Sequence, residues 1–147
     1  SRLREQGFLE ALTEAGLQPD EPECMIQTSA TLENGRTAAR TMLSMSIDKR
    51  PTAIFACNDL LAIGVLQEAS YVGLEVPRDL SVVGFDNTLL ADICHPSLTS
   101  IAQPLRDMTR QSMQQLLDCI ADPDTAKDKV LIQPELVIRQ STGPAPE

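Results

Sequence analysis

The stretch from Thr52 to Asp86 restricts the fold more than any other part of this chain. It begins with a short apolar run, Thr52 to Cys57, which is rich in β-branched and aromatic residues and too short for a helix. A helical pattern then runs from Asp59 to Gly73, and a second apolar run extends from Leu80 to Phe85. This order predicts a strand–helix–strand unit in which both strands are buried.

Polar residues follow each of these predicted strands. Asn58 and Asp59 come directly after the first, and Asp86 and Asn87 come directly after the second. In open α/β sheets, ligands bind in the crevice outside the carboxyl ends of the strands. The unit is therefore predicted to form half of a ligand-binding cleft.

Helices and strands alternate along the rest of the chain. The patterns predict helices at 1–16, 31–47 and 104–120, a helical turn at 89–92, and extended segments at 24–28, 98–102, 130–132 and 136–138. This alternation predicts an α/β fold in which a parallel sheet is flanked by helices on both faces. Pro104 suits the N1 position of its helix, and either Ser29 or Thr31 could cap the helix at 31–47.

The helix predicted at 104–120 has an apolar face without an evident partner. Its stripe consists of Leu105, Met108, Met113, Leu116, Leu117 and Ile120. The first four elements do not supply a surface for it.

Length and charge limit the possible functions. The chain has 147 residues, which fits one domain or part of one. Its 21 acidic and 12 basic side chains give a net charge of −9, which opposes direct contact with a nucleic-acid backbone. If the protein serves DNA, another segment must hold the DNA. The chain opens on a helix without a leader or a starting Met, which suggests a piece of a longer polypeptide.

The cysteines at 24, 57, 94 and 119 form no CxxC pair, and there is a single His, at 95. Cys24 and Cys57 fall within or at the ends of apolar runs, where a free thiol packs as a small hydrophobe. We therefore expect four reduced thiols in a cytoplasmic protein. No membrane span or signal peptide is evident.

Five blocks of sequence make the chain similar to a known family. In order, they are REQGF with its helix (4–17), AIFA and NDLLAIG (53–64), GLEVPRDLSVVGFD (73–86), PSLTSI (96–101) and ELVIRQS (135–141). Over nearly its whole length, the chain resembles the carboxy-terminal half of the effector-binding domain of LacI/GalR-family transcriptional regulators.

The resemblance implies a type I periplasmic-binding-protein-like fold, with two α/β subdomains around a cleft. Residues 1–102 would be the C-terminal subdomain, and 103–128 a crossover segment and helix that pack on the N-terminal subdomain, most of which is absent here. Residues 129–140 would be returning strands and 141–147 a frayed tail. The implied function is to bind a small-molecule effector and so control DNA binding by a helix-turn-helix outside this chain. No cofactor is implied.

The same resemblance implies effector contacts for Arg4, Asn58, Asp86 and Gln103. Two of these residues have alternative interpretations from the sequence itself, since Arg4 could pair with a helical Glu and Asn58 could cap its helix. Asp59 is expected to be structural, because an acid in the first turn favours the helix dipole.

Two departures from the family pattern concern the ligand. Asn87 stands where a second acid usually follows Asp86. Ala30 stands where many sugar- and purine-responsive members place an aromatic ring that stacks on the effector. The missing ring weakens the case for a stacked pyranose or purine.

The family forms homodimers, partly through the helix after Asn58 and Asp59 and the loop after Asp86. We therefore expect interface positions at Ile63, Leu66, Gln67 and Leu89, with their apolar side chains exposed in a single chain.

Two other classes of function remain to be considered. The solute receptor of a sugar ABC transporter shares the fold, and the residues before Ser1 would distinguish it by a signal peptide. The cysteine usage and the VPRDLSVVGFD block favour the regulator. An enzyme or a metal site would need more than Cys94 and His95, and there is no phosphate loop, nucleophile elbow or Cys/His dyad. We therefore expect no catalysis and no metal.

Overall fold

The computed structural model describes residues 2–17, 24–122 and 129–146. Its elements are α1 (Arg2–Glu14), α2 (Leu32–Leu43), β1 (Ala53–Phe55), α3 (Asp59–Tyr71), β2 (Ser81–Phe85), α4 (Leu89–Ile93), β3 (Thr99–Ala102), α5 (Leu105–Ala121) and β4 (Glu135–Val137). The predicted strand–helix–strand unit is confirmed as β1, α3 and β2.

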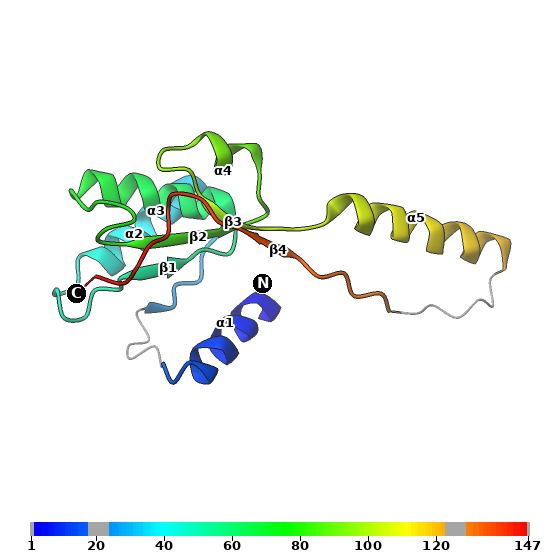
Figure 1. Ribbon diagram of the computed structural model, residues 1–147, viewed down its shortest axis with the longest axis horizontal. Coiled ribbons are helices and arrows are strands. Elements are labelled where there is room, and N and C mark those ends of the chain that lie inside the picture. The colour runs from blue at the N-terminus through cyan, green and yellow to red at the C-terminus, as the bar shows by residue number, and fades with distance from the viewer. Residues whose placement is uncertain (1, 18–23, 123–128, 147) are drawn as a thin grey trace.

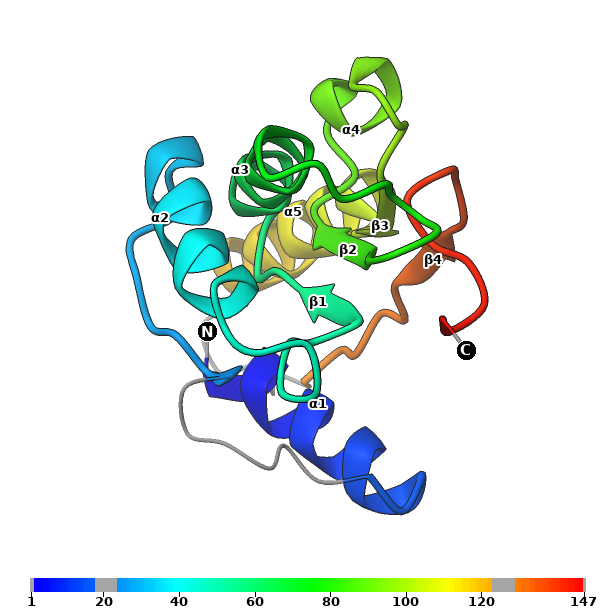
Figure 2. The same cartoon turned by 90° about the vertical axis from the view of Figure 1, so that its left-hand side faces the viewer.

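Within the described residues, four strands form one sheet in the order β1-β2-β3-β4. The first three strands are parallel, and β4 pairs antiparallel with β3, so that Ala102 lies opposite Glu135. Helices α2 and α3 cover one face of the sheet, and α1 lies on the other (Figures 1 and 2). The α/β fold with helices on both faces is therefore confirmed, and the returning strand makes the sheet mixed.

The core lies between the sheet and helices α2 and α3. Ile54 and Val82 point to this side of the strands and are 8% and 0% exposed. They belong to one buried cluster with the apolar stripe of α3, Ala62, Val65 and Ala69. Strand alternation sends Phe55 and Phe85 to the opposite side, toward α1. The sheet thus has an apolar side facing α2 and α3 and a mixed side facing α1.

Helices α2 and α3 are in backbone contact at two glycines. A Cβ atom on Gly35 would lie 2.3 Å from the carbonyl oxygen of Leu61, and one on Gly64 would lie 2.2 Å from that of Leu32. No real Cβ tolerates such distances, so the crossing requires glycine at both positions.

A buried carboxylate joins the same two helices near their other ends. Glu68 of α3 is 0% exposed, and it accepts hydrogen bonds from Arg40 Nε at 2.8 Å and Arg40 Nη2 at 3.2 Å. Arg36 Nε lies 3.5 Å from Glu68 Oε2. Because Arg40 hydrogen-bonds to it, the pKa of Glu68 falls below its ordinary value of 4.5.

The sequence left the N-cap of α2 undecided and predicted Pro104 at the N1 position of α5. The structure decides the first and differs from the second. The hydroxyl of Thr31 accepts a hydrogen bond from Asn34 N at 3.2 Å, so Thr31, rather than Ser29, caps α2. Pro104 occupies the N-cap of α5 instead of N1, with ψ of 63°.

Two predicted strands are wrong. Residues 25–28 and 129–134 run without strand pairing. In the first segment, Met25 is half-buried beside a cavity, so the apolar character of this segment reflects burial and not pairing with another strand. In the second segment, Val130 and Leu131 are 44% and 82% exposed and have no neighbouring strand among the described residues.

The prediction of a frayed tail at 141–147 is wrong for residues 141–143. Ser141 is 0% exposed, its Oγ donates to Val82 O at 2.6 Å, and it accepts from Thr99 N at 2.8 Å. Gly143 N donates to Ser81 Oγ at 3.1 Å. Residues 141–143 are therefore held to β2 and β3 by hydrogen bonds.

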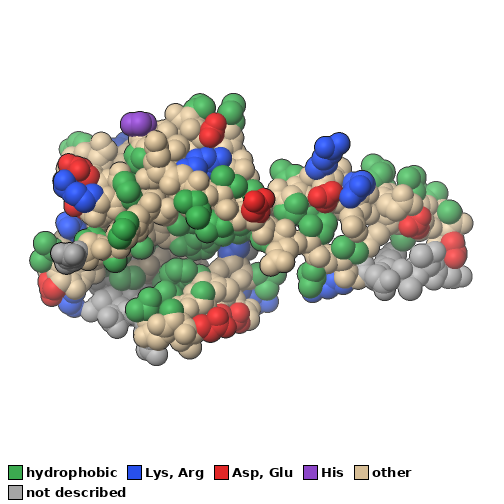
Figure 3. Space-filling model, in the orientation of Figure 1, with side chains coloured by type: hydrophobic (Ala, Val, Ile, Leu, Met, Phe, Trp, Pro, Cys, Tyr) green, Lys and Arg blue, Asp and Glu red, His purple; other side chains and the backbone are tan. Residues whose placement is uncertain are grey.

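Helix α5 extends away from the body of the domain as an arm (Figure 1). Its apolar stripe is exposed: Leu105 59%, Met108 39%, Met113 53%, Leu116 54%, Leu117 53% and Ile120 69%. Figure 3 shows apolar side chains along this arm, outside the compact body. A surface of this kind marks an interaction site.

The expected exposure of the dimer positions is wrong for two of the four. Ile63 and Leu66 are 8% and 6% exposed and belong to the core, because α3 packs against both α2 and the sheet. Gln67 is exposed, and Leu89 is 75% exposed.

Replacing Gly64 by Ala should destabilise the domain by about 1–3 kcal/mol or more, because the new methyl group meets backbone that cannot move aside. Gly7→Ala is the matched control. Gly7 is also helical, but a Cβ there meets nothing within 4 Å, so this change should stabilise by roughly 0.5–1 kcal/mol. Urea unfolding of both variants measures the difference, and a Gly64→Ala protein as stable as the parent would contradict the backbone contact.

The acid limb of the stability curve should depend on Glu68. Because the folded-state pKa of Glu68 lies below 4.5, its contribution is present above pH 4.5 and is lost as pH falls further through the folded-state value. Glu68→Gln should lower stability at neutral pH and flatten the loss below pH 4.5. Asp79, whose pKa is lowered by Arg78, keeps some slope in both proteins. If the free energy of unfolding falls equally steeply below pH 4.5 in Glu68→Gln and in the parent protein, the role of Glu68 in the acid loss is contradicted.

Candidate functional site

The carboxyl ends of three parallel strands meet at one edge of the sheet. Asn58 follows β1, Asp86 follows β2 and Gln103 follows β3, while α1 brings Arg4 to the same edge. Arg4, Asn58 and Asp86 line a cavity of about 1060 Å³. Gln103 reaches the site through its hydrogen bond to Asp86. The four residues predicted to contact effector are thus brought together.

Arg4 is held at this edge by three contacts. Its Nη1 donates to the carbonyl oxygen of Cys57, its Nη2 lies 3.6 Å from Asp86 Oδ1, and its guanidinium carbon lies 3.6 Å from the centroid of the Phe85 ring. A cation over an aromatic face is attracted by the ring quadrupole. Arg4 therefore points into the site rather than pairing with a glutamate of its own helix.

Phe85 was not among the predicted site residues. Strand alternation contained the signal, because it places Phe55 and Phe85 on the α1 side of the sheet. Phe55 stacks on Phe8 of α1, with ring centroids 5.7 Å apart. Thus the two rings on the sheet attach α1 to it: Phe55 through Phe8, and Phe85 through Arg4.

Asp86 presents a partly exposed carboxylate to the cavity. Gln103 Nε2 donates to its Oδ1 at 2.7 Å, and Arg4 approaches the same oxygen. Both contacts fall on Oδ1, and Asp86 lines the cavity, so its carboxylate can also accept hydrogen bonds from a ligand. The arrangement suits a ligand that donates hydrogen bonds through hydroxyl or amino groups.

Asn58 combines the two roles that the sequence left open. Its Oδ1 accepts from Leu61 N at 2.9 Å with φ at −155°, so it is the N-cap of α3. Its side chain also lines the cavity, where the amide NH₂ can donate to a ligand.

Ala30 lies at the wall of the same cavity and is exposed. The position where a stacking ring was expected is therefore at the site, and it carries a methyl group. Residue 30 therefore offers no ring on which a ligand could stack.

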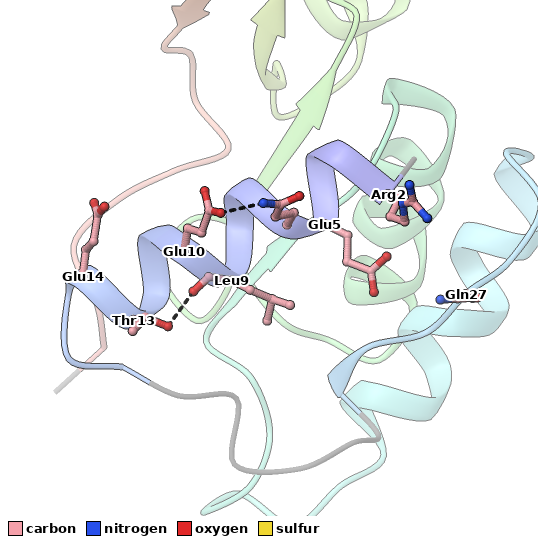
Figure 4. A pocket seen from close by; sticks show the side chains of 8 residues that line it. Arg2, Glu5, Leu9, Glu10, Thr13, Glu14 and Gln27 are labelled. Carbon is pink, nitrogen blue, oxygen red and sulfur yellow. Dashed lines mark hydrogen bonds between the residues drawn. The ribbon is translucent and has the colours of Figure 1, made fainter.

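A second hollow, of about 750 Å³, lies along the outer side of α1 (Figure 4). Its lining includes Glu5, Glu10 and Glu14, together with Gln27 from the following segment. None of the four predicted effector contacts lines it, so it does not compete as the site.

Within the described residues, no group of three His, Cys, Asp or Glu side chains could hold a metal ion. Cys24, Cys57, Cys94 and Cys119 are all free thiols. Burial raises the pKa of the Cys94 thiol, which makes it a poor nucleophile near neutral pH. Over the same part of the chain, no helix has the length and apolar character needed to cross a bilayer.

Comparison with known proteins agrees with this fold. The profile of the periplasmic binding protein-like domain family matches residues 1–142. The transcriptional regulator DegA of Bacillus subtilis is 43% identical over 141 residues, which cover 96% of this chain and 41% of DegA. The repressor CytR of Escherichia coli K12 is 38% identical over 143 residues, covering 97% of this chain and 41% of CytR.

The solved structures that match this chain include regulators of the LacI family. A LacI-family regulatory protein from Chloroflexus aggregans matches with a TM-score of 0.88 and 34% identity, over 95% of this chain and 50% of its own. A complex of the regulator CelR with cellobiose matches at 0.82 and 32% identity, over 94% and 41%. A LacI-family regulator from Enterococcus faecium with bound ribose matches at 0.82 and 29% identity, over 96% and 51%.

This is a periplasmic-binding-protein-like domain, as the three-strand edge and its flanking helices indicate. The chain belongs to the LacI family of transcriptional regulators. It spans about 41% of the length of the curated relatives described above. DegA is a transcriptional regulator and CytR a transcriptional repressor.

Proposed function

We propose that this chain is the effector-sensing part of a bacterial LacI-type regulator. The observation that carries the proposal is the convergence of Arg4, Asn58, Asp86 and Gln103 at the carboxyl ends of three parallel strands. The ligand is a polar, hydroxyl-bearing small molecule, for which cellobiose and ribose in two structural neighbours are precedents. The same fold serves transport receptors, but the named relatives are regulators, so a transport role is not favoured.

The arm supplies the connection to the rest of the regulator. Helix α5 and the returning strand β4 carry an exposed apolar surface, which packs on the N-terminal subdomain that completes the cleft. An effector held between the two subdomains then shifts their closure by its differential affinity, typically worth about 1–3 kcal/mol. A helix-turn-helix outside this chain reads the DNA, which agrees with the net charge of −9 here and with a cytoplasmic location.

A homodimer forms through the exposed surface of α3 and α4. Leu89 and Ile93 of α4 are 75% and 65% exposed, and Tyr71 at the end of α3 is 77% exposed. Gln67 lies one helical turn before Tyr71. Ile63 and Leu66 support this surface from the core instead of forming it.

Asp86→Asn should weaken binding of the sugar that the full-length protein recognises by about 10- to 100-fold, the usual cost of losing a hydrogen bond to a charged group. Asparagine tolerates positive φ, so the turn is preserved. Calorimetric titration with ribose, cellobiose and sucrose measures the effect. Asn58→Ser, which keeps the cap and removes the amide donor, should also weaken binding. Glu10→Gln at the second hollow should not, and undiminished affinity in Asp86→Asn would reject the site.

The paired change Leu89→Lys and Ile93→Lys should convert the full-length dimer to monomers, because two apolar side chains that the dimer buries are replaced by charged ones. Sedimentation velocity measures the change. Ile47→Lys is the control, since Ile47 is 83% exposed and lies in the turn that follows α2. A dimer that survives the pair of lysines, or a parent protein that is strictly monomeric, would contradict the interface.

A further inference from the structure

The turn that carries Asp86 has a backbone conformation that non-glycine residues seldom adopt. Asp86 has φ of 107° and Asn87 has φ of 50°. L-residues other than glycine rarely adopt such angles, and they persist where the surroundings impose them. The direction in which Asp86 points therefore depends on the groups that hold the turn.

Three consecutive backbone N–H groups of the turn are held by groups outside it. Asp86 N donates to Ile101 O at 2.9 Å, Asn87 N donates to Ser100 Oγ at 3.1 Å, and Thr88 N donates to Asp59 Oδ2 at 2.6 Å. Two of the three acceptors are side-chain oxygens. The turn is therefore determined by side chains at a distance in the sequence.

Asp59 supplies one of these two side-chain acceptors and orients the other, Ser100. Ser100 Oγ donates its proton to Asp59 Oδ1 at 2.6 Å. A hydroxyl has one proton, so this bond turns the lone pairs of Ser100 toward Asn87 N. The carboxylate thus holds Thr88 directly and Asn87 through Ser100.

Asp59 is placed for this role by burial and close packing. It is 1% exposed and Ser100 is 0% exposed, so neither can touch a ligand in the cavity. A Cβ on Gly84 would lie 2.5 Å from Asp59 Oδ1, so the carboxylate reaches the turn over a glycine of β2. On the other side of the turn, Arg139 Nη2 donates to Asn87 Oδ1 at 2.7 Å.

We propose that Asp59 is a positioning residue for effector binding. Its buried carboxylate imposes the left-handed turn at Asp86 and Asn87, and thereby holds the Asp86 carboxylate beside Gln103 and Arg4. The inference rests on the proposed function of Asp86 as an effector contact, and it extends that function to a group that never meets the effector.

The geometric part can be tested without an effector, by NMR on the full-length protein. The side-chain amide of Gln103, identified by its loss in Gln103→Glu, reports its hydrogen bond to Asp86. In Asp59→Ala this resonance should move to the position it has in Asp86→Ala, and the amides of Asn87 and Thr88 should exchange faster. Ser100→Ala should speed hydrogen exchange of the Asn87 amide, and this variant provides the test if Asp59→Ala does not fold.

Glu68→Gln is the matched control, because Glu68 is the other buried carboxylate of α3 and contacts α2 instead of the turn. It should lower stability and leave the Gln103 resonance in place. An unchanged resonance and unchanged exchange in Asp59→Ala and Ser100→Ala would overturn the proposal. The same would follow if Glu68→Gln moved the resonance as far as Asp59→Ala does.

Titration with ribose then separates this proposal from the proposed function. Asp59→Ala should lose about 10- to 100-fold in affinity, as for Asp86 itself, and should cause no further loss in an Asp86→Ala background. A further loss in that background would overturn a role exerted through Asp86. If no hydroxyl-bearing sugar binds the parent protein, the proposed effector role fails, whereas the NMR result still decides whether Asp59 holds the turn.

Discussion

Contact between the backbones of α2 and α3 determines where the functional edge of this domain lies. Gly35 and Gly64 let the two helices touch, and Glu68 with Arg40 and Arg36 joins them farther along. With its axis fixed in this way, α3 begins shortly after the end of β1. Its N-cap Asn58 and its first residue Asp59 therefore lie at the functional edge, where Asp59 contacts Thr88 after β2 and Ser100 in β3. The cap, the buried carboxylate and the cleft all follow from that one packing geometry.

Sequence periodicity predicted the parts of the fold in which local pattern and tertiary environment agree. Between Thr52 and Asp86, both strands are short apolar runs and the helix between them has a buried stripe, so each local preference matches its final surroundings. Asp86 could be recognised for a related reason. A carboxylate after a buried strand needs polar partners, and Gln103 and Arg4 supply them. The resemblance to the LacI family added Arg4 and Gln103, which spacing alone did not identify.

The failures share a physical cause, since hydrophobicity reports burial and not the partner that provides it. Met25 and Leu131 lie in apolar runs that looked like strands, yet neither pairs with a strand in the part of the chain that the structure describes. Ile63 and Leu66 looked available for a partner chain because one helical stripe was assigned to the core, whereas α3 is covered on two sides. The role of Ser141 and the support given by Ser100 depend on contacts between residues tens of positions apart, which no local pattern records.

The pairing of β3 with β4 has a consequence for the arm. Ala102, where the chain leaves the body, lies opposite Glu135, where it returns. Ser141 then secures the returning chain to β2 and β3. In terms of architecture, α5 and its flanks are an insertion in the turn of a β-hairpin, whose two strands stay joined whatever the insertion does. A tight turn that joins Gln103 to Glu135 in place of α5 would therefore close the body and retain all four residues of the cleft edge.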